Sequence, residues 1–180
     1  MVGSDGTAGK SIVNVEIRDA TFSDAKAIAD IFYHTVLNVN VRDYSRTQVE
    51  AWAGAAPDPE KWQRRIAAVQ SSRQTFVAVH GGQVLGFAEF EGDGHIDTLY
   101  VHHDFQDCGI ATRLLEKIEA EAQRRCLARL YTEASITARP FFERRGFSVV
   151  TPQSVEVRGQ TFRNYRMEKT GHPGEPGENA

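Results

Sequence analysis

Apolar residues along the chain change their spacing several times, and each change marks a predicted element. The stretch "IVNVEIR" at 12–18 alternates apolar and polar positions, which is typical of a strand with one buried face. Over 21–39 the apolar residues recur every three or four positions, so a helix is predicted there. Thr21 followed by Asp24 has the spacing of a capping box, which favours a helix start at this point.

Two short helices and a hairpin are expected next. The stretches 45–54 and 57–70 are predicted helices, and the second has Asp58 as its N-cap and Pro59 as its first residue. The period then falls to two in "QTFVAVH" and "QVLGFAEF". Gly81-Gly82 between these two runs predicts a tight turn, and therefore a hairpin.

The second half of the chain alternates strands and helices. The run 95–101 predicts a strand, and a polar loop leads from it to Gly109 and a long amphipathic helix. A strand over 128–134, a helix over 136–145 and a closing hairpin over 154–169 are expected after it. This order predicts a mixed α/β domain of the α+β class with a largely antiparallel sheet.

The composition fits one domain and excludes several classes of function. The chain has 180 residues, of which 41% are hydrophobic and 25% charged, enough for one core and a polar surface. A net charge of −3 argues against a protein that binds nucleic acid mainly through phosphate contacts. No apolar run approaches the roughly 20 residues of a membrane span. We expect a cytoplasmic protein with no nucleic-acid partner and no membrane partner.

The two ends and the cysteines add little chemistry. The segments 1–11 and 171–180 are rich in small, polar, glycine and proline residues, so they are expected to be disordered around a folded domain over 12–170. The two cysteines, Cys108 and Cys126, have neither the spacing of a disulfide framework nor that of a zinc site. No metal site is expected.

The polar loop between the strand 95–101 and the helix after it carries the strongest signal. The first amides of a helix have no backbone partner, and they carry about half a positive charge together. A loop that bends over such an end can bind a phosphate, and Gly109 would let the backbone approach the anion closely. The bland alternative is a strand-to-helix connection with a convenient glycine.

Two stretches resemble the landmarks of one enzyme family. "VHHDFQDCGIATRLL" resembles the coenzyme-A loop of the GNAT superfamily of N-acetyltransferases, Gln/Arg-x-x-Gly-x-Gly/Ala after an apolar strand. "EASITARPFFERRGFSVV" resembles that family's second landmark, an Asn-x-x-Ala-x-x-x-Tyr helix that ends in Gly-Phe. The resemblance spans about 14–169, and "YSRTQVEAWA" before a tryptophan helix is similar to a bacterial branch of small members.

The resemblance implies a fold and a cofactor. It implies a twisted, mostly antiparallel sheet of about seven strands with four to five helices, in which the neighbouring parallel strands 95–101 and 128–134 splay apart. Acetyl-CoA would lie between these strands. Its pantetheine arm would bond the backbone edge at Leu99, Tyr100 and Val101. Its pyrophosphate would lie on the loop residues Gln106, Asp107, Cys108, Gly109, Ile110, Ala111 and Thr112.

Acetyl transfer to an amine needs a proton acceptor, because a free alkylamine is mostly protonated at neutral pH. His95 is the first candidate base, since it stands where relatives often carry an acidic base and its ordinary pKa suits the task. Asp97, two residues on, is expected to share its face, and Glu89 is a third candidate. The alternative for His95 is a solvent-facing residue after a tight turn.

The family's usual acid and helix cap are both replaced. Phe142 stands in the tyrosine position and cannot donate a proton, so it is expected to pack against the cofactor or the core. Ser135 stands in the asparagine position, where it can still cap the helix or bond the cofactor. Tyr100 and Tyr165 are the other candidate donors.

Several further residues have weaker readings. Arg42 and Tyr44 lie between the first helices, where relatives shape the acceptor pocket, so they are candidate substrate-binding residues. The pair His102 and His103 resembles a metal pair, but neighbouring strand-end side chains are expected to point apart into solvent. Trp52 and Trp62 are expected in the core, and the candidates to pair with a cofactor phosphate are Arg139, Arg144 and Arg145.

The leading interpretation is an acetyl-CoA-dependent N-acetyltransferase that acts on a primary amine of a small molecule or a protein. A non-catalytic acyl-CoA sensor on the same fold is the alternative, and Phe142 favours it. A third interpretation is an interaction module that keeps only the scaffold. A homodimer is allowed by all three.

Overall fold

A computed structural model describes residues 14–68 and 73–171. It contains five α-helices and seven strands among those residues. In chain order they are β1 (Glu16–Asp19), α1 (Ala25–Asn38), α2 (Arg46–Ala53), α3 (Pro59–Ala67), β2 (Gln74–His80), β3 (Gln83–Phe90), β4 (Ile96–Val101), α4 (Ile110–Arg124), β5 (Arg129–Ser135), α5 (Arg139–Arg144), β6 (Ser148–Val157) and β7 (Gln160–Thr170).

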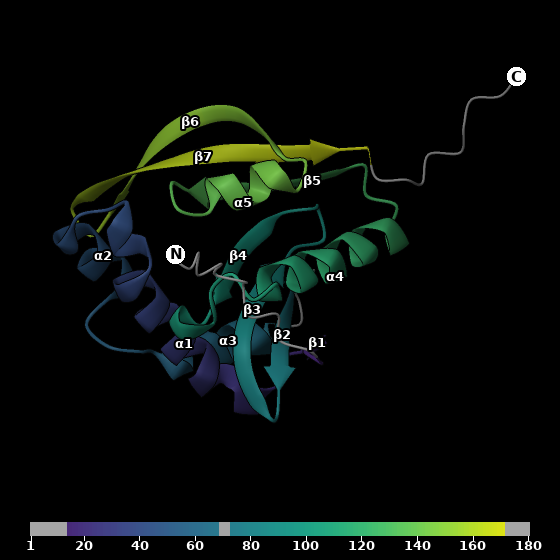
Figure 1. The fold of residues 1–180 in the computed structure, drawn as a ribbon, viewed down its shortest axis with the longest axis horizontal. Coiled ribbons are helices and arrows are strands. Elements are labelled where there is room, and N and C mark those ends of the chain that lie inside the picture. Colours follow the sequence, from purple (N-terminus) through teal and green to yellow (C-terminus); the bar gives the residue numbers. More distant parts are fainter. Residues whose placement is uncertain (1–13, 69–72, 172–180) are drawn as a thin grey trace, which may run out of the picture.

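The strands form two antiparallel sheets that meet at one point. The order is β1-β2-β3-β4 in the first sheet and β5-β7-β6 in the second. The contact between them is a parallel bridge from His95 to Tyr131, at the beginnings of β4 and β5. In Figure 1 the sheet of β5, β6 and β7 lies above and that of β1 to β4 below, with α2 at one side and α4 at the other. The mixed fold and the splayed parallel strands are thereby confirmed.

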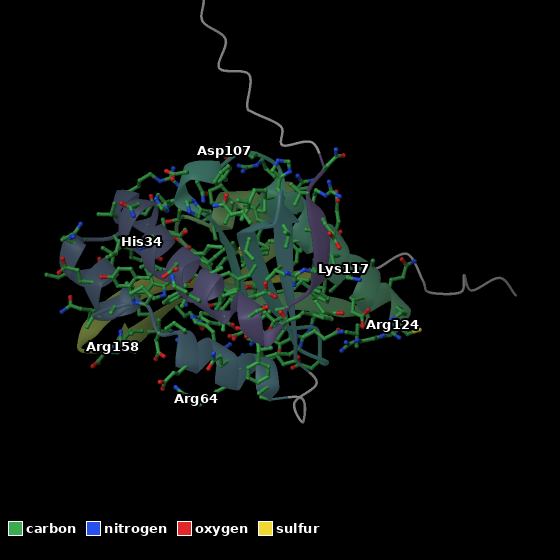
Figure 2. The ribbon with its side chains drawn as sticks, turned by 90° about the horizontal axis from the view of Figure 1, so that it is seen from below. His34, Arg64, Asp107, Lys117, Arg124 and Arg158 are labelled. Carbon is green, nitrogen blue, oxygen red and sulfur yellow. The ribbon has the colours of Figure 1, made fainter. Side chains whose placement is uncertain are left out.

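Helices cover both faces of the first sheet. Ile110, Leu114 and Ile118 of α4 are almost completely buried against one face, in a cluster that also contains Phe90 and Met167. Side chains of α1 and α3, including Trp62, pack with Phe87 and Val77 on the other face. Charged residues on the outer sides of these helices, such as Arg64 and Arg124, point away from the ribbon (Figure 2).

Local sequence signals account for most element boundaries. Asp58 caps α3 by accepting from the amide of Lys61 at 2.9 Å, with Pro59 as first residue. Thr21 and Asp24 form the expected capping box, although the first turn after Thr21 is a 3-10 helix and α1 begins at Ala25. The Gly81-Gly82 turn joins β2 to β3 as predicted, with positive φ at both residues.

Two expected strands have different bounds in the structure, and some expectations concern residues outside the described part of the chain. The last strand pair is longer than predicted, because β6 begins at Ser148 and pairs with β7 through a register shift after Val149. The first strand begins at Glu16, and the residues of "IVNVEIR" up to Val13 lie outside the described part of the chain. Outside it too are the expected disordered ends, apart from Gly171, and the last residues of the helix predicted over 57–70.

Candidate active site

A cavity of about 750 Å³ opens where β4 and β5 part. Asp97 to Val101 of β4 form one wall, and Thr132 to Ser135 of β5 form another. The loop 105–112 closes one end, together with α5. Residues from α2, β6 and β7 close the other end. A cavity of this size suits a small-molecule ligand.

Two hydrogen bonds hold the strands together at their beginnings. The amide of Tyr131 donates to the carbonyl of Gly94 at 3.0 Å, and Thr132 Oγ1 donates to the carbonyl of Ile96 at 2.8 Å. Gly94 has φ +97°, and a Cβ there would lie 2.2 Å from the carbonyl oxygen of Arg129. A glycine is therefore required where the two sheets touch. Beyond Ile96 the two strands diverge, while β5 remains paired with β7 along its other edge from Arg129 to Ser135.

The divergence leaves part of the β4 backbone facing the cavity. The amide of His102 donates to Leu85 of β3 at 2.8 Å, and in antiparallel pairs the bonded residues alternate. Leu99 and Val101 therefore direct their backbone groups away from β3, toward the cavity. The carbonyl of Val101 already accepts from Thr35 Oγ1 and Gln106 Nε2, so Leu99 and the Val101 amide are the groups that a ligand would bond.

The loop before α4 has the backbone shape that the sequence indicated. Gly109 has φ +81° immediately before the first helical residue, and Asp107 has φ +59°. Gln106 uses its side chain to hold the loop, donating to the carbonyls of Val101 at 2.7 Å and His102 at 3.1 Å. All of 106–112 line the cavity, so the N-terminus of α4 faces it.

A glycine on β3 and basic side chains on α5 complete this end. A Cβ on Gly86 would lie 3.0 Å from Ile110 Cγ2, so the missing side chain lets α4 rest directly on the sheet. Arg145 donates to Thr112 Oγ1, and Arg144 and Arg145 both line the cavity. An anion at this end would meet helix amides and two guanidinium groups.

The two departures from the family pattern have clear structural roles. Ser135 Oγ accepts from the amide of Ala138 at 3.0 Å, so it caps the turn before α5. Phe142 is 3% exposed, and its ring packs edge-on against Phe141 and Phe147 while lining the cavity. Tyr165 does not line the cavity, and Arg139 and Arg163 lie over its ring.

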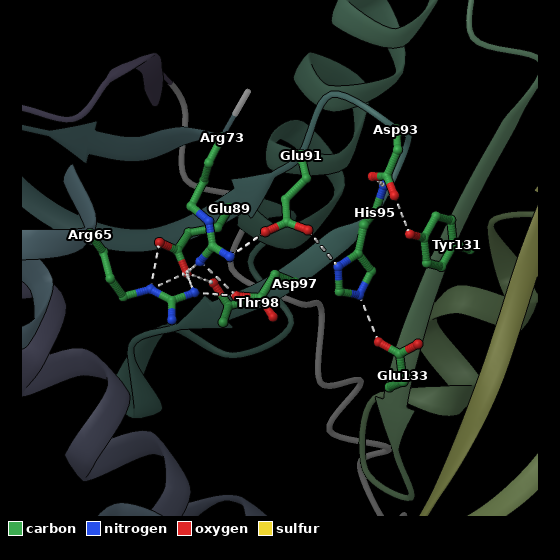
Figure 3. A network of polar contacts seen from close by, with 10 residues as sticks. All are labelled: Arg65, Arg73, Glu89, Glu91, Asp93, His95, Asp97, Thr98, Tyr131 and Glu133. Atoms are coloured by element: carbon green, nitrogen blue, oxygen red, sulfur yellow. Dashed lines mark hydrogen bonds and ion pairs between the residues drawn. The ribbon is translucent and has the colours of Figure 1, made fainter. Parts of the chain in front are cut away.

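A bulge in β4 decides where Asp97 points. Thr98 pairs with Glu89 and Ile96 pairs with Phe90, so Asp97 is an extra residue between the two pairs. Its carboxylate lies against Arg65 of α3 and 3.0 Å from Arg73 Nη1 (Figure 3). Bulges re-aim side chains next to active sites. Asp97 and His95 belong to one polar network, because Glu91 bonds His95 and also Arg73, which in turn holds Asp97.

Glu89 is held as a buried ion pair. Its side chain is 0% exposed, and Arg65 donates to its two oxygens at 2.9 and 3.0 Å through Nε. Thr98 Oγ1 adds a third donor at 3.2 Å. Glu89 does not line the cavity, so a substrate amine in the cavity would not touch it.

His95 is held between two carboxylates. Its Nδ1 lies 3.0 Å from Glu91 and its Nε2 lies 2.6 Å from Glu133, while its ring stacks on Tyr131 (Figure 3). Burial lowers the pKa of His95, but the bonds to Glu91 and Glu133 outweigh it, so the pKa is raised. His95 itself does not line the cavity, whereas Glu133 does.

Aromatic side chains form the end of the cavity opposite the loop. Tyr44, Trp52 and Phe162 contact one another with ring centroids 5.6 to 5.8 Å apart. Tyr100 lines the same region, and burial followed by the negative charge of Asp97 raises its pKa well above the ordinary value. Arg42 is exposed at the rim, where its Nε donates to the carbonyl of Val39 at 3.1 Å.

Sequence reasoning missed three of these residues. Glu133 and Phe162 lie on strands with an ordinary alternation of inward and outward side chains. No local sequence motif identifies either residue as part of a site. Trp52 was predicted to be a core residue, but it is half-buried and lines the cavity, whereas Trp62 is 2% exposed and does lie in the core. A helical residue that faces a cavity and one that faces the core give the same apolar periodicity in the sequence, so the two cannot be distinguished from it.

The histidine pair after β4 also differs from the expectation. The rings of His102 and His103 do not point apart but stack, with centroids 4.4 Å apart. Asp104 lies close enough that the three side chains offer ligand atoms within 4.8 Å of one another. His102 Nδ1, however, accepts from the amide of Asp104 at 3.2 Å and so caps a short 3-10 turn. The three residues lie outside the cavity lining.

Comparisons with known proteins agree on one family. The family model described as an acetyltransferase (GNAT) domain matches residues 40–169. An uncharacterized N-acetyltransferase of Escherichia coli (strain K12), YafP, is 35% identical over 155 residues, 86% of this chain and 95% of the relative. Among the described residues, no helix is long and apolar enough to cross a bilayer.

Solved structures give the same picture. The crystal structure described as a GCN5-related N-acetyltransferase, "Aminotransferase, Class-II", from Rhodopseudomonas palustris is 33% identical, with a TM-score of 0.80 over 87% of this chain and 96% of that one. The PaiA N-acetyltransferase from Thermoplasma acidophilum, solved with coenzyme A, is 18% identical with a TM-score of 0.72, over 88% of this chain and 100% of that one.

Proposed function

The chain belongs to the GNAT family of acetyltransferases, and on that basis we propose that it transfers the acetyl group of acetyl-CoA to a primary amine bound between β4 and β5. The observation that carries the proposal is the continuous cavity from the amides of 106–112 to the free backbone edge at Leu99. The reaction joins the amine nitrogen to the carbonyl carbon of the thioester, breaks the carbon–sulfur bond, and releases one proton and coenzyme A.

The residues at the loop end hold the cofactor. The N-terminus of α4 and the guanidinium groups of Arg144 and Arg145 bind its phosphates. Leu99 and the amide of Val101 bond its extended arm as a neighbouring strand would, which leaves the thioester near the point where β4 and β5 diverge. Phe142 packs against the arm as an apolar wall.

Glu133 and His95 take up the proton. Glu133 lines the cavity on β5, and its Oε2 lies 2.6 Å from His95 Nε2. A proton leaving the amine reaches the Glu133 carboxylate, and neutral His95 accepts it from there. Asp97 and Glu89 are engaged by arginines, so their role is to fix the bulge in β4 rather than to take a proton.

Tyr100 serves the leaving group. A tyrosine of ordinary pKa, about 10, is already protonated throughout the neutral range, and burial raises the pKa of Tyr100 further, so its hydroxyl donates a hydrogen bond toward the sulfur. A coenzyme A thiol has an ordinary pKa of about 8.5, so the thiolate leaves without full protonation and a hydrogen-bond donor is sufficient. This assigns to Tyr100 the part that Phe142 cannot play.

Two measurements test the proposal. Acetyl-CoA is titrated into the full chain by calorimetry, and release of free thiol is then followed with a panel of primary amines. We expect binding and amine-dependent thiol release. Binding without release with any amine would instead favour an acyl-CoA sensor, for which the buried ring of Phe142 in the usual acid position is the supporting observation. Absence of binding would reject both.

A further inference from the structure

The end of the cavity opposite the loop is a pocket of aromatic rings with carboxylates beside it. Tyr44, Trp52, Tyr100 and Phe162 contribute the rings, and Val155 and Val157 of β6 add apolar surface. Their elements are held together by direct contacts: Gln48 of α2 donates to the carbonyl of Thr161 in β7 at 2.6 Å. The wall is therefore part of the fold and exists before any ligand binds.

The polar groups at this end are largely used by the protein itself. The hydroxyl of Tyr44 donates to the carbonyl of Arg163 at 2.7 Å and accepts from the amide of Ile136 at 2.9 Å. Asn40 Nδ2 donates to Thr137 Oγ1 at 3.4 Å. A ligand at this end therefore meets the ring of Tyr44 rather than its hydroxyl, and the site favours an apolar group there.

The geometry of the rings favours an aromatic group over an aliphatic one. Trp52 meets Tyr44 at an interplanar angle of 83° and Phe162 at 77°, so the rings already pack edge to face. A further ring can join such a cluster edge-on or offset, and it gains more than its buried area alone provides. An aliphatic chain would gain only the hydrophobic free energy of its buried apolar area.

The charges indicate where the amine lies. Asp97 and Glu133 line the cavity close to the bridge where β4 and β5 meet. The Oδ1 of Asn164 is buried at the same cavity without a partner among the described residues. An ammonium group would give Asn164 Oδ1 a partner and would add a further contact to Asp97, which arginines already hold, and to Glu133, which His95 already contacts. Tyr100 and Trp52 would favour a cation near their faces.

We propose that the acceptor is an arylalkylamine, a primary amine joined to one aromatic ring by a short alkyl chain. The ring occupies the pocket of Tyr44, Trp52 and Phe162, and the amine lies between Asp97 and Glu133, beside the thioester. This inference rests on the proposed acetyltransferase function and names the substrate class of the same site.

The test compares amines that differ in the group attached to the nitrogen. Turnover is measured with 2-phenylethylamine, ethylamine, 1,4-diaminobutane and a short unstructured peptide. We expect kcat/KM for 2-phenylethylamine to exceed that for ethylamine by roughly 10- to 100-fold, the factor for burying one ring. Equal values for these two, or a higher value for the diamine or the peptide, would overturn the proposal.

Variants locate the preference in the pocket. Trp52→Ala should remove most of the advantage of 2-phenylethylamine, while Trp52→Phe should retain most of it. Phe22→Ala is the matched control, because Phe22 is 57% exposed, lies outside the cavity and loses an aromatic ring in the same way. Thermal unfolding checks that each variant is folded. A preference that survives Trp52→Ala in a folded protein would contradict the assignment.

A binding measurement distinguishes a wrong acceptor class from a wrong proposed function. The chain is saturated with coenzyme A and then titrated with 2-phenylethylamine by calorimetry, so the result does not depend on turnover. Normal acetyl-CoA binding with no binding of 2-phenylethylamine rejects the acceptor class and leaves the proposed function intact. Failure to bind acetyl-CoA rejects the proposed function itself.

Discussion

Glu133 Oε2 lies 2.6 Å from His95 Nε2, and this contact joins a residue that lines the cavity to one that does not. The two residues are 38 positions apart and meet because β4 and β5 touch at the His95–Tyr131 bridge. The ring of His95 is also fixed by stacking on Tyr131, whose hydroxyl lies 2.5 Å from Asp93. Proton transfer between the cavity and the protein surface can follow this path.

The raised pKa of His95 predicts the acidic limb of the pH profile. Only neutral His95 can accept a proton, and Glu91 and Glu133 keep it protonated above its ordinary pKa of about 6.5. We expect kcat/KM to rise with pH through an apparent pKa above that value. The measurement needs an amine of higher pKa, so that its own titration does not overlap the limb.

Glu133→Gln tests the same relationship from the cavity side. Losing one carboxylate lowers the pKa of His95, so the acidic limb of the pH profile should move toward lower pH. In addition, kcat should fall by roughly 10²-fold or more, because no carboxylate then carries the proton from the amine to His95. Glu91→Gln is the control, since it also removes one carboxylate from His95 but lies outside the cavity lining. A limb that does not move in either variant would place the base elsewhere.

The free energy of unfolding should depend on the same titration of His95, but it should fall as pH rises, whereas kcat/KM should rise. A histidine whose folded pKa is raised stabilises the fold fully below its unfolded pKa, and this contribution is lost as pH rises through the folded pKa. Urea unfolding is expected to show a loss of stability above about pH 6.5 that is absent in His95→Gln. An identical pH dependence in the two proteins would mean that His95 titrates alike when folded and unfolded.

Gly109→Glu should abolish acetyl-CoA binding. The backbone there has φ +81° and open space beside it, so the new carboxylate would occupy the position where an anion meets the helix amides. Gly82→Glu is a matched control, because Gly82 also has φ +81° with open space, but in the β2–β3 turn. Both variants suffer the same backbone strain, of order 1 kcal/mol. Equal acetyl-CoA affinity in the two folded variants would contradict the loop assignment.

The sequence predicted features that depend on neighbouring residues. Asp58 and Pro59 were sufficient for the start of α3, and Gly109 for the left-handed turn before α4, because caps and turns are set by local backbone chemistry. The bulge at Asp97 could not be predicted, since it exists only relative to the partner strand β3. The same holds for Glu133 beside His95, which depends on how two distant strands meet.

Phe142→Tyr should fold and raise turnover. The ring lines the cavity, so we expect the added hydroxyl to reach the cavity rather than the core behind Phe147. A second donor near the sulfur would then add to Tyr100, with a gain of up to about 10²-fold. The variant is assayed for thiol release and thermal unfolding. A stability loss of about 1–3 kcal/mol without faster turnover would show that the hydroxyl is buried without a partner.

Arg65 and Glu89 should be strongly coupled in stability. Glu89 is 0% exposed and its main partner is the Arg65 guanidinium, so Arg65→Met leaves a buried carboxylate that retains only its weaker contacts with Thr98 and Arg73. Breaking a buried pair on one side costs about 3–5 kcal/mol, whereas replacing both partners by apolar residues is often nearly neutral.

We therefore expect Arg65→Met to be more destabilising than the double variant Arg65→Met/Glu89→Leu, measured by urea unfolding at neutral pH. Arg64→Met, at the preceding residue of α3, which is exposed to solvent, should change stability by less than about 1 kcal/mol. The single variant Glu89→Leu completes the cycle, and if its effect and that of Arg65→Met add up to the effect of the double variant, the two side chains are not coupled. If the double variant also keeps acetyl-CoA affinity but loses turnover, the pair's further role is to hold Asp97 in the bulge of β4, because Arg65 contacts both carboxylates.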